Sequence, residues 1–112
     1  MPATLPSTGL QALARERLII ALDTPNAEEA LDIVSELSGE VFAFKVGLQL
    51  FTAEGSALLS KLVERGERIF LDLKFHDIPN TTAMAAVSAA RLGVWMMNFH
   101  ASAGREALET AR

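Results

Sequence analysis

Short apolar runs alternate with amphipathic segments along the chain from residue 17 onward. Strands covered on both faces are apolar almost throughout, so four such runs predict β-strands. They occupy residues 17–23, 41–46, 68–73 and 94–100. Apolar residues at helical spacing follow each run and predict helices. These occupy residues 27–37, 48–65, 81–92 and 104–112. The predicted order is strand then helix, four times over.

Turn-forming residues separate these elements. Thr24-Pro25-Asn26 breaks the chain and caps the first helix, and Gly55 interrupts the second. Pro79 is assigned to a loop because it cannot continue a strand. Residues 1–16 are interpreted as an N-terminal extension with a lead-in helix from residue 10, and residues 17–112 as one domain.

Strands alternating with helices imply parallel pairing, in either an open doubly wound sheet or part of a barrel. Polar residues favour the barrel, since an α/β barrel carries its active site at the carboxyl ends of its strands. The polar residues at or near those ends are Asp23, Lys45, Asp72, Lys74 and His100. The phosphate-binding patterns G-x-G-x-x-G and G-x-x-x-x-G-K-[ST] are absent. A full (βα)8 TIM barrel takes ~250 residues, so 112 residues with four βα units correspond to a half barrel.

The stretch from residue 68 to residue 81 carries the densest chemistry. Asp72 and Lys74 project from the same face of the predicted strand, because strand side chains alternate, and Asp77 follows the strand end. Each unpaired buried charge would cost several kcal/mol, so the three groups are expected to neutralise one another. This pattern predicts a charged site at the strand end.

Each candidate residue also has a purely structural interpretation. In the structural interpretation, the Lys45 side chain extends to solvent from an edge strand. In the same interpretation, Asp23 only caps the helix that follows it. His100 is then a strand-end histidine with satisfied hydrogen bonds. Asp72, Lys74 and Asp77 form a structural ion-pair network in the same alternative.

Composition excludes several classes of function. The formal net charge is −4, the pI is near 5.1 and the basic residues are scattered, so no nucleic-acid partner is expected. Cysteine is absent, which excludes disulfides and thiolate metal sites; no metal site is predicted. No apolar run approaches the ~18 residues of a membrane span, and residues 1–9 lack the features of a signal peptide. A cytoplasmic protein without membrane partners is expected.

Four collinear motifs carry a resemblance to a known family. They are Ala-Leu-Asp at the first strand, Phe-Lys-Val-Gly at the second, Asp-Leu-Lys-Phe-His-Asp-Ile-Pro-Asn-Thr at the third and Asn-Phe-His-Ala-Ser at the fourth. Across residues 17–105 the chain resembles the orotidine 5'-monophosphate decarboxylases. The D-x-K-x-x-D core alone is shared with related sugar-phosphate decarboxylases and synthases. The His-Asp-Ile-Pro-Asn-Thr extension favours the pyrimidine nucleotide enzyme.

The resemblance implies cofactor-free decarboxylation of orotidine 5'-monophosphate (OMP) to UMP and carbon dioxide in de novo pyrimidine biosynthesis. Lys74 matches the proton donor, and Asp72 matches the carboxylate beside the substrate carboxylate. Lys45 and Asp77 complete the charged network. The resemblance implies three further roles. Asp23 and Lys45 hold the ribose hydroxyls, His100 is counted with the substrate-binding residues, and Asp77, Ile78 and Thr81 reach the partner's site in a homodimer.

The sequence departs from the family mainly in length. The resemblance places the loop over the pyrimidine, and the glutamine and arginine that grip the phosphate, in later strands beyond Arg112. Ala103 stands where the family has glycine. Two hypotheses follow. The chain is a decarboxylase represented by part of its barrel, or it is a catalytically inactive half barrel that self-associates through its open sheet edges.

Overall fold

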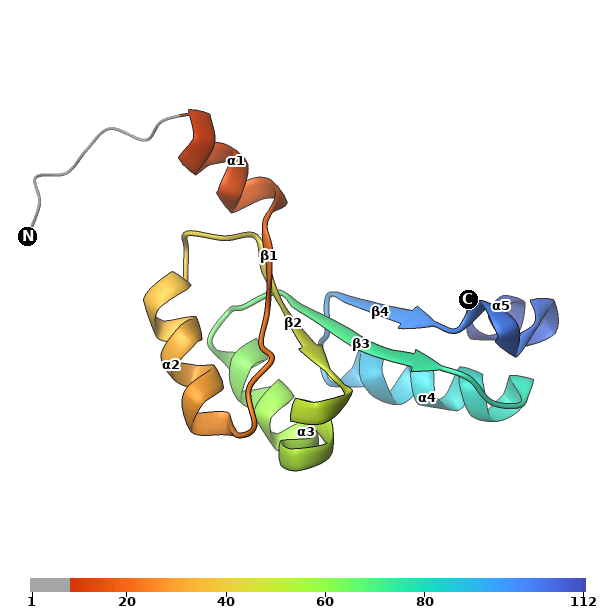
Figure 1. Ribbon diagram of the computed structural model, residues 1–112. Helices are drawn as coiled ribbons and strands as arrows, with labels where there is room; N and C mark the ends of the chain where they lie inside the picture. The colour runs from red at the N-terminus through yellow and green to blue at the C-terminus, as the bar shows by residue number, and fades with distance from the viewer. Residues whose placement is uncertain (1–8) are drawn as a thin grey trace, which may run out of the picture.

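The computed structural model describes residues 9–112, and the first part of the predicted extension, residues 1–8, lies outside them. Four parallel strands form one sheet in the order β1-β2-β3-β4 (Figure 1). The strands are β1 (Ile19–Ala21), β2 (Ala43–Gly47), β3 (Ile69–Phe75) and β4 (Met96–Phe99). A doubly wound sheet reverses its strand order at a switch point, whereas this order is sequential. The predicted barrel type of winding is therefore confirmed.

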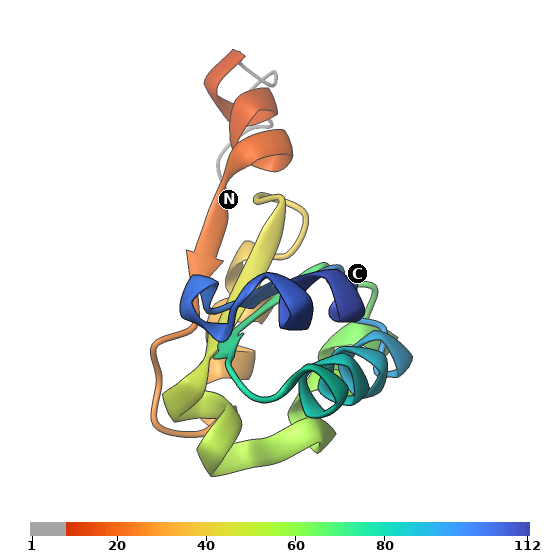
Figure 2. The same cartoon turned by 90° about the vertical axis from the view of Figure 1, so that its right-hand side faces the viewer.

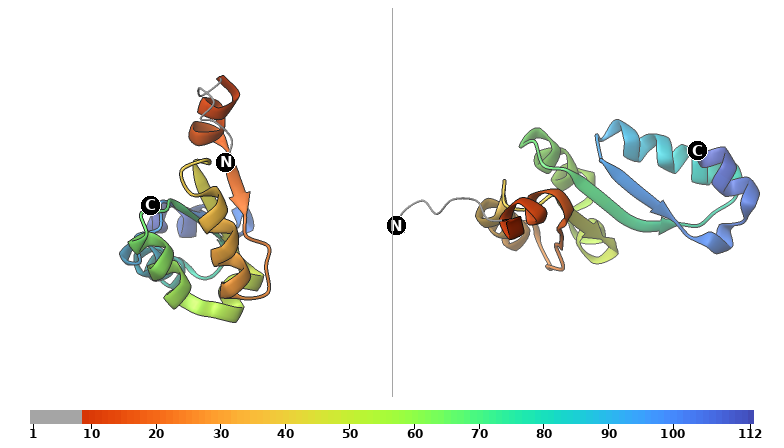
Figure 3. Two further views of the ribbon diagram at one scale, coloured as in Figure 1. Left: turned by 90° about the vertical axis from the view of Figure 1, so that its left-hand side faces the viewer. Right: turned by 90° about the horizontal axis from the view of Figure 1, so that it is seen from above.

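Three helices connect the strands and wrap one side of the twisted sheet (Figures 1 and 3). The helices are α1 (Gly9–Arg17), α2 (Ala27–Leu37), α3 (Leu48–Glu64), α4 (Pro79–Arg91), the 3-10 helix η1 (Ala101–Ala103) and α5 (Arg105–Ala111). The connecting helices are α2, α3 and α4, and α5 packs against α4. Helix α1 has no buried residue and projects beyond the sheet (Figure 2). Across residues 9–112, no helix is both long and apolar enough to cross a membrane.

The hydrophobic core lies between the sheet and these three helices. Alternate strand residues face it, with Phe44 paired to Ile69 and Val46 paired to Leu71. All four are at most 2% exposed. Burying a side chain of this size contributes roughly 1.5–3 kcal/mol, so this face supplies most of the driving force for folding the sheet.

Helix boundaries follow local signals in the sequence. Helix α2 has the predicted bounds, and the Asn26 side chain accepts a hydrogen bond from the Glu29 N–H at 2.9 Å as its N-cap. The predicted interruption of α3 occurs at Gly55, where φ is +65°. Gly93 follows α4 with φ +88°, and a Cβ there would lie 2.9 Å from Val63. Both conformation and space therefore require glycine at residue 93.

Two predicted boundaries are wrong in an informative way. Pro79 is the first residue of α4 and not part of a loop, since its missing N–H falls where a helix has no partner for it. Strand β3 continues two residues beyond the predicted end, through Lys74 to Phe75, because β4 runs alongside it and pairs Phe75 with Phe99. The other three strands are shorter than predicted at their amino ends.

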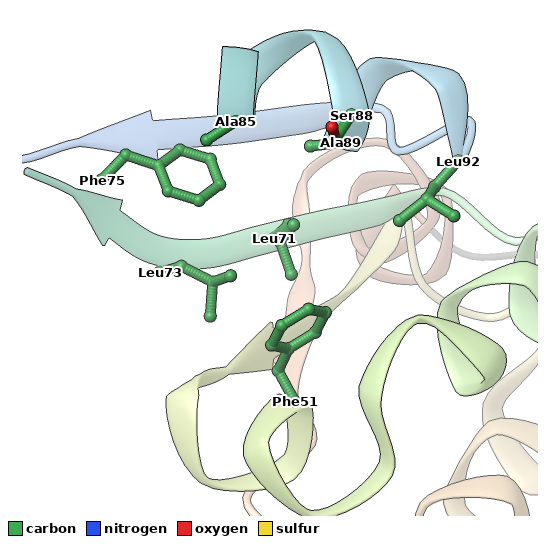
Figure 4. Close-up of a pocket in the computed structure, with 8 residues that line it drawn as sticks. All are labelled: Phe51, Leu71, Leu73, Phe75, Ala85, Ser88, Ala89 and Leu92. Carbon is green, nitrogen blue, oxygen red and sulfur yellow. The ribbon is translucent and has the colours of Figure 1, made fainter. Parts of the chain in front are cut away.

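An apolar cavity of about 180 Å³ lies between α3, β3 and α4 (Figure 4). Its lining residues are Phe51, Leu71, Leu73, Phe75, Ala85, Ser88, Ala89 and Leu92. In Figure 4 the short side chains of Ala85, Ser88 and Ala89 on α4 face the larger side chains of β3. Small residues on α4 therefore leave space in this part of the core.

Candidate functional site

Three charged side chains meet on the sheet face opposite the core. Lys45 comes from β2, and Asp72 and Lys74 come from β3. The Lys74 Nζ lies 2.8 Å from Asp72 Oδ1, and the Lys45 Nζ lies 3.7 Å from Asp72 Oδ2. We call these three residues the charge cluster. The Asp72 side chain is 14% exposed while that of Lys74 is 61% exposed, so the carboxylate is the enclosed centre of the cluster.

Strand register explains why the cluster forms. Asp72 stands opposite Gly47, which has no side chain, so the space beside Asp72 is open to Lys45 two residues earlier on β2. Strand β2 lies between β1 and β3. The interpretation of Lys45 as a lysine snorkelling from an edge strand is therefore wrong. Lys45 is half-buried in the middle of the sheet and faces a carboxylate.

The Asp72 carboxylate is held in its ionised form. Its hydrogen bond from Lys74 and a second from the Asn98 amide lower the pKa of Asp72 below the ordinary value of 3.8. The positive charge of Lys45 acts in the same direction, and partial burial opposes all three without cancelling them. Asp72 is therefore a fixed negative charge between two ammonium groups at neutral pH.

Asn98 is a residue of this site that the sequence analysis missed. Its Nδ2 donates to Asp72 Oδ1 at 2.6 Å, and its Oδ1 accepts from the backbone N–H of Lys74 at 2.9 Å. A signal was present, since Asn98 is the one polar residue of Met96–Phe99, on a strand that pairs with β3. Asparagine inside a short apolar strand indicates a specific hydrogen-bonding need.

The structure leaves Asp77 outside the charge cluster. Its Oδ1 accepts from the N–H of Ile78 at 2.7 Å, and its carbonyl accepts from the buried hydroxyl of Thr82 at 3.0 Å. Within residues 9–112 no ion pair joins Asp77 to Lys74 or Lys45, so the predicted mutual neutralisation of three charges does not include Asp77. Ile78 is 65% exposed and Thr81, in the first turn of α4, is also exposed.

Asp23 and His100 lie just beyond the carboxyl ends of β1 and β4. Asp23 is exposed, and Asn26 is the N-cap of α2, so the interpretation of Asp23 as the helix cap is wrong. His100 Nδ1 accepts from the Ser102 N–H at 3.1 Å, and the ring stacks on His76 with centroids 4.9 Å apart. The acceptor role of Nδ1 leaves the proton of a neutral His100 on Nε2.

This arrangement suits an anionic substrate that needs a proton. Two ammonium groups and one carboxylate leave the charge cluster with one net positive charge. The exposed Lys74 ammonium is able to contact a ligand while Asp72 fixes its position. Among residues 9–112 no group of three or more histidine, aspartate or glutamate side chains is placed to hold a metal ion.

Comparison with known proteins shows a family match that includes the residues of the charge cluster. The family model described as "Orotidine 5'-phosphate decarboxylase / HUMPS family" matches residues 16–112. The chain is 54% identical over 96 residues to the orotidine 5'-phosphate decarboxylase of Nitrosospira multiformis, covering 86% of this chain and 40% of that protein. The enzyme of the same name from Alkalilimnicola ehrlichii is 55% identical over 100 residues, covering 89% and 43%.

Solved structures agree with these matches. The orotidine 5'-phosphate decarboxylase of Lactobacillus acidophilus superposes with a TM-score of 0.78 at 42% identity, covering 84% of this chain and 42% of that one. The enzyme of the same name from Pyrococcus horikoshii gives a TM-score of 0.77 at 29% identity, covering 83% and 45%. The chain thus spans about 40% of the length of the curated relatives that it matches.

Proposed function

The chain belongs to the orotidine 5'-phosphate decarboxylase / HUMPS family, and we propose that it carries the proton-delivering part of an OMP decarboxylase site. The observation that carries this proposal is the charge cluster, in which Asp72 fixes the Lys74 ammonium on the open face of the sheet. The His-Asp-Ile-Pro-Asn-Thr sequence that follows Phe75 favours OMP over the sugar phosphates handled by related enzymes.

Lys74 is the proposed proton donor. Loss of carbon dioxide from C6 of the pyrimidine leaves an electron pair on that carbon, and the reaction uses no cofactor to delocalise it. A fixed ammonium stabilises the developing negative charge and then transfers its proton to C6, which yields UMP. Lys74 regains a proton from solvent. Its 61% exposed side chain and its 2.8 Å contact with Asp72 support both steps.

Asp72 and Lys45 complete the proposed chemistry on this chain. Asp72 lies beside the substrate carboxylate in this proposal and, being ionised, holds Lys74 in place. Lys45 balances the charge of Asp72 and extends toward the ribose hydroxyls, which Asp23 also contacts. The net positive charge of the cluster favours a substrate that carries both a carboxylate and a phosphate. His100, at the same end of the sheet, is proposed to line the substrate site through Nε2.

A homodimer with shared sites is part of the proposal. Asp77, Ile78 and Thr81 contribute to the partner's site, and their position supports this role. All three are exposed, Asp77 and Ile78 between β3 and α4 and Thr81 in the first turn of α4, and Ile78 presents an apolar side chain that is 65% exposed. The hydrogen bonds from Ile78 and Thr82 to Asp77 hold this segment in one shape. We also propose that the protein is cytoplasmic, as expected from the sequence.

Decarboxylation of OMP, followed by pyrimidine absorbance, tests the proposal. The 112-residue chain is assayed alone and together with the C-terminal portion of a curated relative, which supplies the rest of the barrel; we call this mixture the complemented chain. The complemented chain is expected to turn over OMP, and the chain alone is expected to be a poor catalyst because remote phosphate binding lowers the barrier in such enzymes.

The matched control substrate is orotidine, the nucleoside that lacks the 5'-phosphate of OMP. The complemented chain should convert it far more slowly than OMP. A complemented chain that assembles yet leaves OMP unchanged would refute the proposed activity. A chain that forms stable oligomers without its complement and resists complementation would favour the inactive half barrel, whose open sheet face includes Ile19 at 38% exposure.

A further inference from the structure

We propose that Asn98 is a positioning residue that clamps Asp72 and the backbone of Lys74 together in the geometry the reaction requires. The inference deepens the proposed decarboxylase function and rests on it for the identity of the reaction. The side-chain amide of Asn98 makes hydrogen bonds with two groups of β3, the Asp72 carboxylate and the backbone N–H of Lys74. The argument depends on an irregularity in the pairing of β3 with β4.

The register between β3 and β4 shifts between Leu71 and Phe75. Leu71 pairs with Met97 and Phe75 pairs with Phe99, so four residue steps on β3 correspond to two steps on β4. Within this irregularity Lys74 has φ +52°, the only positive φ of a non-glycine residue in the described chain. Left-handed backbone is unfavourable for a residue with a long side chain and persists only where surrounding contacts enforce it.

Asn98 supplies such a contact. A bulged residue loses its place in the ladder, so the N–H of Lys74 needs an acceptor from elsewhere, and Asn98 Oδ1 provides it at 2.9 Å. The side chain thereby substitutes for a strand carbonyl. Because the Lys74 backbone is held at this angle, its side chain turns back over Asp72 and the 2.8 Å contact forms.

The same amide fixes the carboxylate. Asn98 Nδ2 donates to Asp72 Oδ1 at 2.6 Å, the oxygen that also accepts from Lys74 Nζ. Only one orientation of the amide satisfies both partners, since a flipped group would face its oxygen toward a carboxylate and its NH2 toward an N–H. One asparagine therefore sets the relative position of the carboxylate and the ammonium. Among the described residues 9–112, no other amide or hydroxyl side chain donates a hydrogen bond to Asp72.

Two substitutions separate the two hydrogen bonds. Asn98→Ala removes both, whereas Asn98→Asp keeps an acceptor for the Lys74 N–H and replaces the donor to Asp72 with a second carboxylate. NMR titration of the Asp72 carboxyl and amide hydrogen exchange at Lys74 are measured in the full 112-residue chain. Both variants should raise the pKa of Asp72. Only Asn98→Ala should speed exchange at Lys74, by about tenfold for the loss of one ordinary hydrogen bond.

Asn26→Ala is the matched control, because Asn26 also accepts a hydrogen bond from a backbone N–H but does so as the cap of α2, outside the charge cluster. It should leave the Asp72 titration and Lys74 exchange as in the wild type. An unchanged Asp72 pKa together with unchanged Lys74 exchange in the Asn98 variants would overturn the inference. If Asn98→Ala fails to fold, the Asp72 titration in Asn98→Asp decides alone.

Kinetics of the complemented chain distinguish this inference from the proposed function. Asn98→Ala should lower kcat by more than tenfold with little change in KM, since it misplaces the proton donor and leaves substrate contacts intact. A complemented wild type without turnover would refute the decarboxylase function, while the NMR results would still decide whether Asn98 clamps the cluster. A variant with wild-type kcat would overturn the positioning role in catalysis.

Discussion

The two faces of the sheet differ in what they do, although they are built from the same strands. On β3 the face toward the helices presents Leu71 at 2% exposure, and the next residue, Asp72, faces the other way into the charge cluster. On β2 the same alternation sets buried Phe44 beside Lys45. The core and the charge cluster, to which we assign the proposed chemistry, are therefore built from adjacent residues whose side chains point in opposite directions.

This division explains how a charged site is held without a core of its own. The apolar face fixes the strands, and the strands fix the spacing of the charged groups on the other face. Asp72 and Lys45 meet because Gly47 leaves space between them, and Lys74 turns toward Asp72 because Asn98 holds its backbone. A change on the apolar face should therefore affect folding first, and a change on the charged face should affect chemistry first.

Substitutions at two neighbouring residues of β2 should give the largest difference in the free energy of unfolding. Phe44→Ala removes a fully buried ring from the core and should lower the free energy of unfolding by about 3–5 kcal/mol. Lys45→Met removes a partly exposed ion pair and should change it by no more than about 1 kcal/mol. Urea denaturation of the 112-residue chain measures both. Equal losses of stability in the two variants would contradict the division between the faces.

The pH dependence of stability tests the charged face. The pKa of Asp72 is lowered in the folded state, so its ionised form contributes stability above the unfolded value of ~3.9. That contribution should begin to fade below about pH 5 and disappear as the pH falls through the folded-state pKa. The difference in unfolding free energy between wild type and Asp72→Asn should therefore shrink on acidification.

Asn26→Ala is the control for this titration. Loss of the helix cap should cost about 1 kcal/mol, and asparagine does not ionise, so this difference should stay constant from neutral to acid pH. If the Asp72→Asn difference is as flat as that of Asn26→Ala, the ion pairs of the charge cluster contribute no pH-dependent stability.

Filling the cavity beneath α4 should have the smallest effect on the free energy of unfolding. Ala85→Met should extend into the space of about 180 Å³ and raise the free energy of unfolding by about 0.5–1 kcal/mol. Ala90→Met, on an exposed position of the same helix, is the control and should leave stability nearly unchanged. Thermal unfolding compares the two. A loss of stability in Ala85→Met alone would show that the cavity wall cannot accept a longer side chain.

The sequence predicted much of this division, because periodicity and alternation are local properties. The helix bounds of α2 and the kink at Gly55 follow from residues that act on their own backbone. The shared face of Asp72 and Lys74 follows from strand geometry. Features that depend on pairing between strands were missed. The clearest are the extension of β3, the positive φ of Lys74 and the role of Asn98.

The prediction that Asp77 belongs to the charged network failed for a different reason. The spacing of residues 72, 74 and 77 indicated one network, yet the first turn of α4 directs Asp77 to its own backbone neighbours. Spacing along the chain does not determine distance where a strand ends and a helix begins. The proposed role of Asp77 at the partner's site therefore remains a prediction about the dimer.

The most direct test of the central claim is the rate of OMP decarboxylation by the complemented chain with Lys74→Ala, compared with Lys61→Ala. Lys61 is an exposed lysine of α3, on the helical side of the sheet and away from the charge cluster. The account predicts that Lys74→Ala lowers kcat by at least ~10²-fold, the usual contribution of a positioned acid, while Lys61→Ala keeps the wild-type rate. Equal rates in the two variants would contradict the assignment of Lys74 as the proton donor.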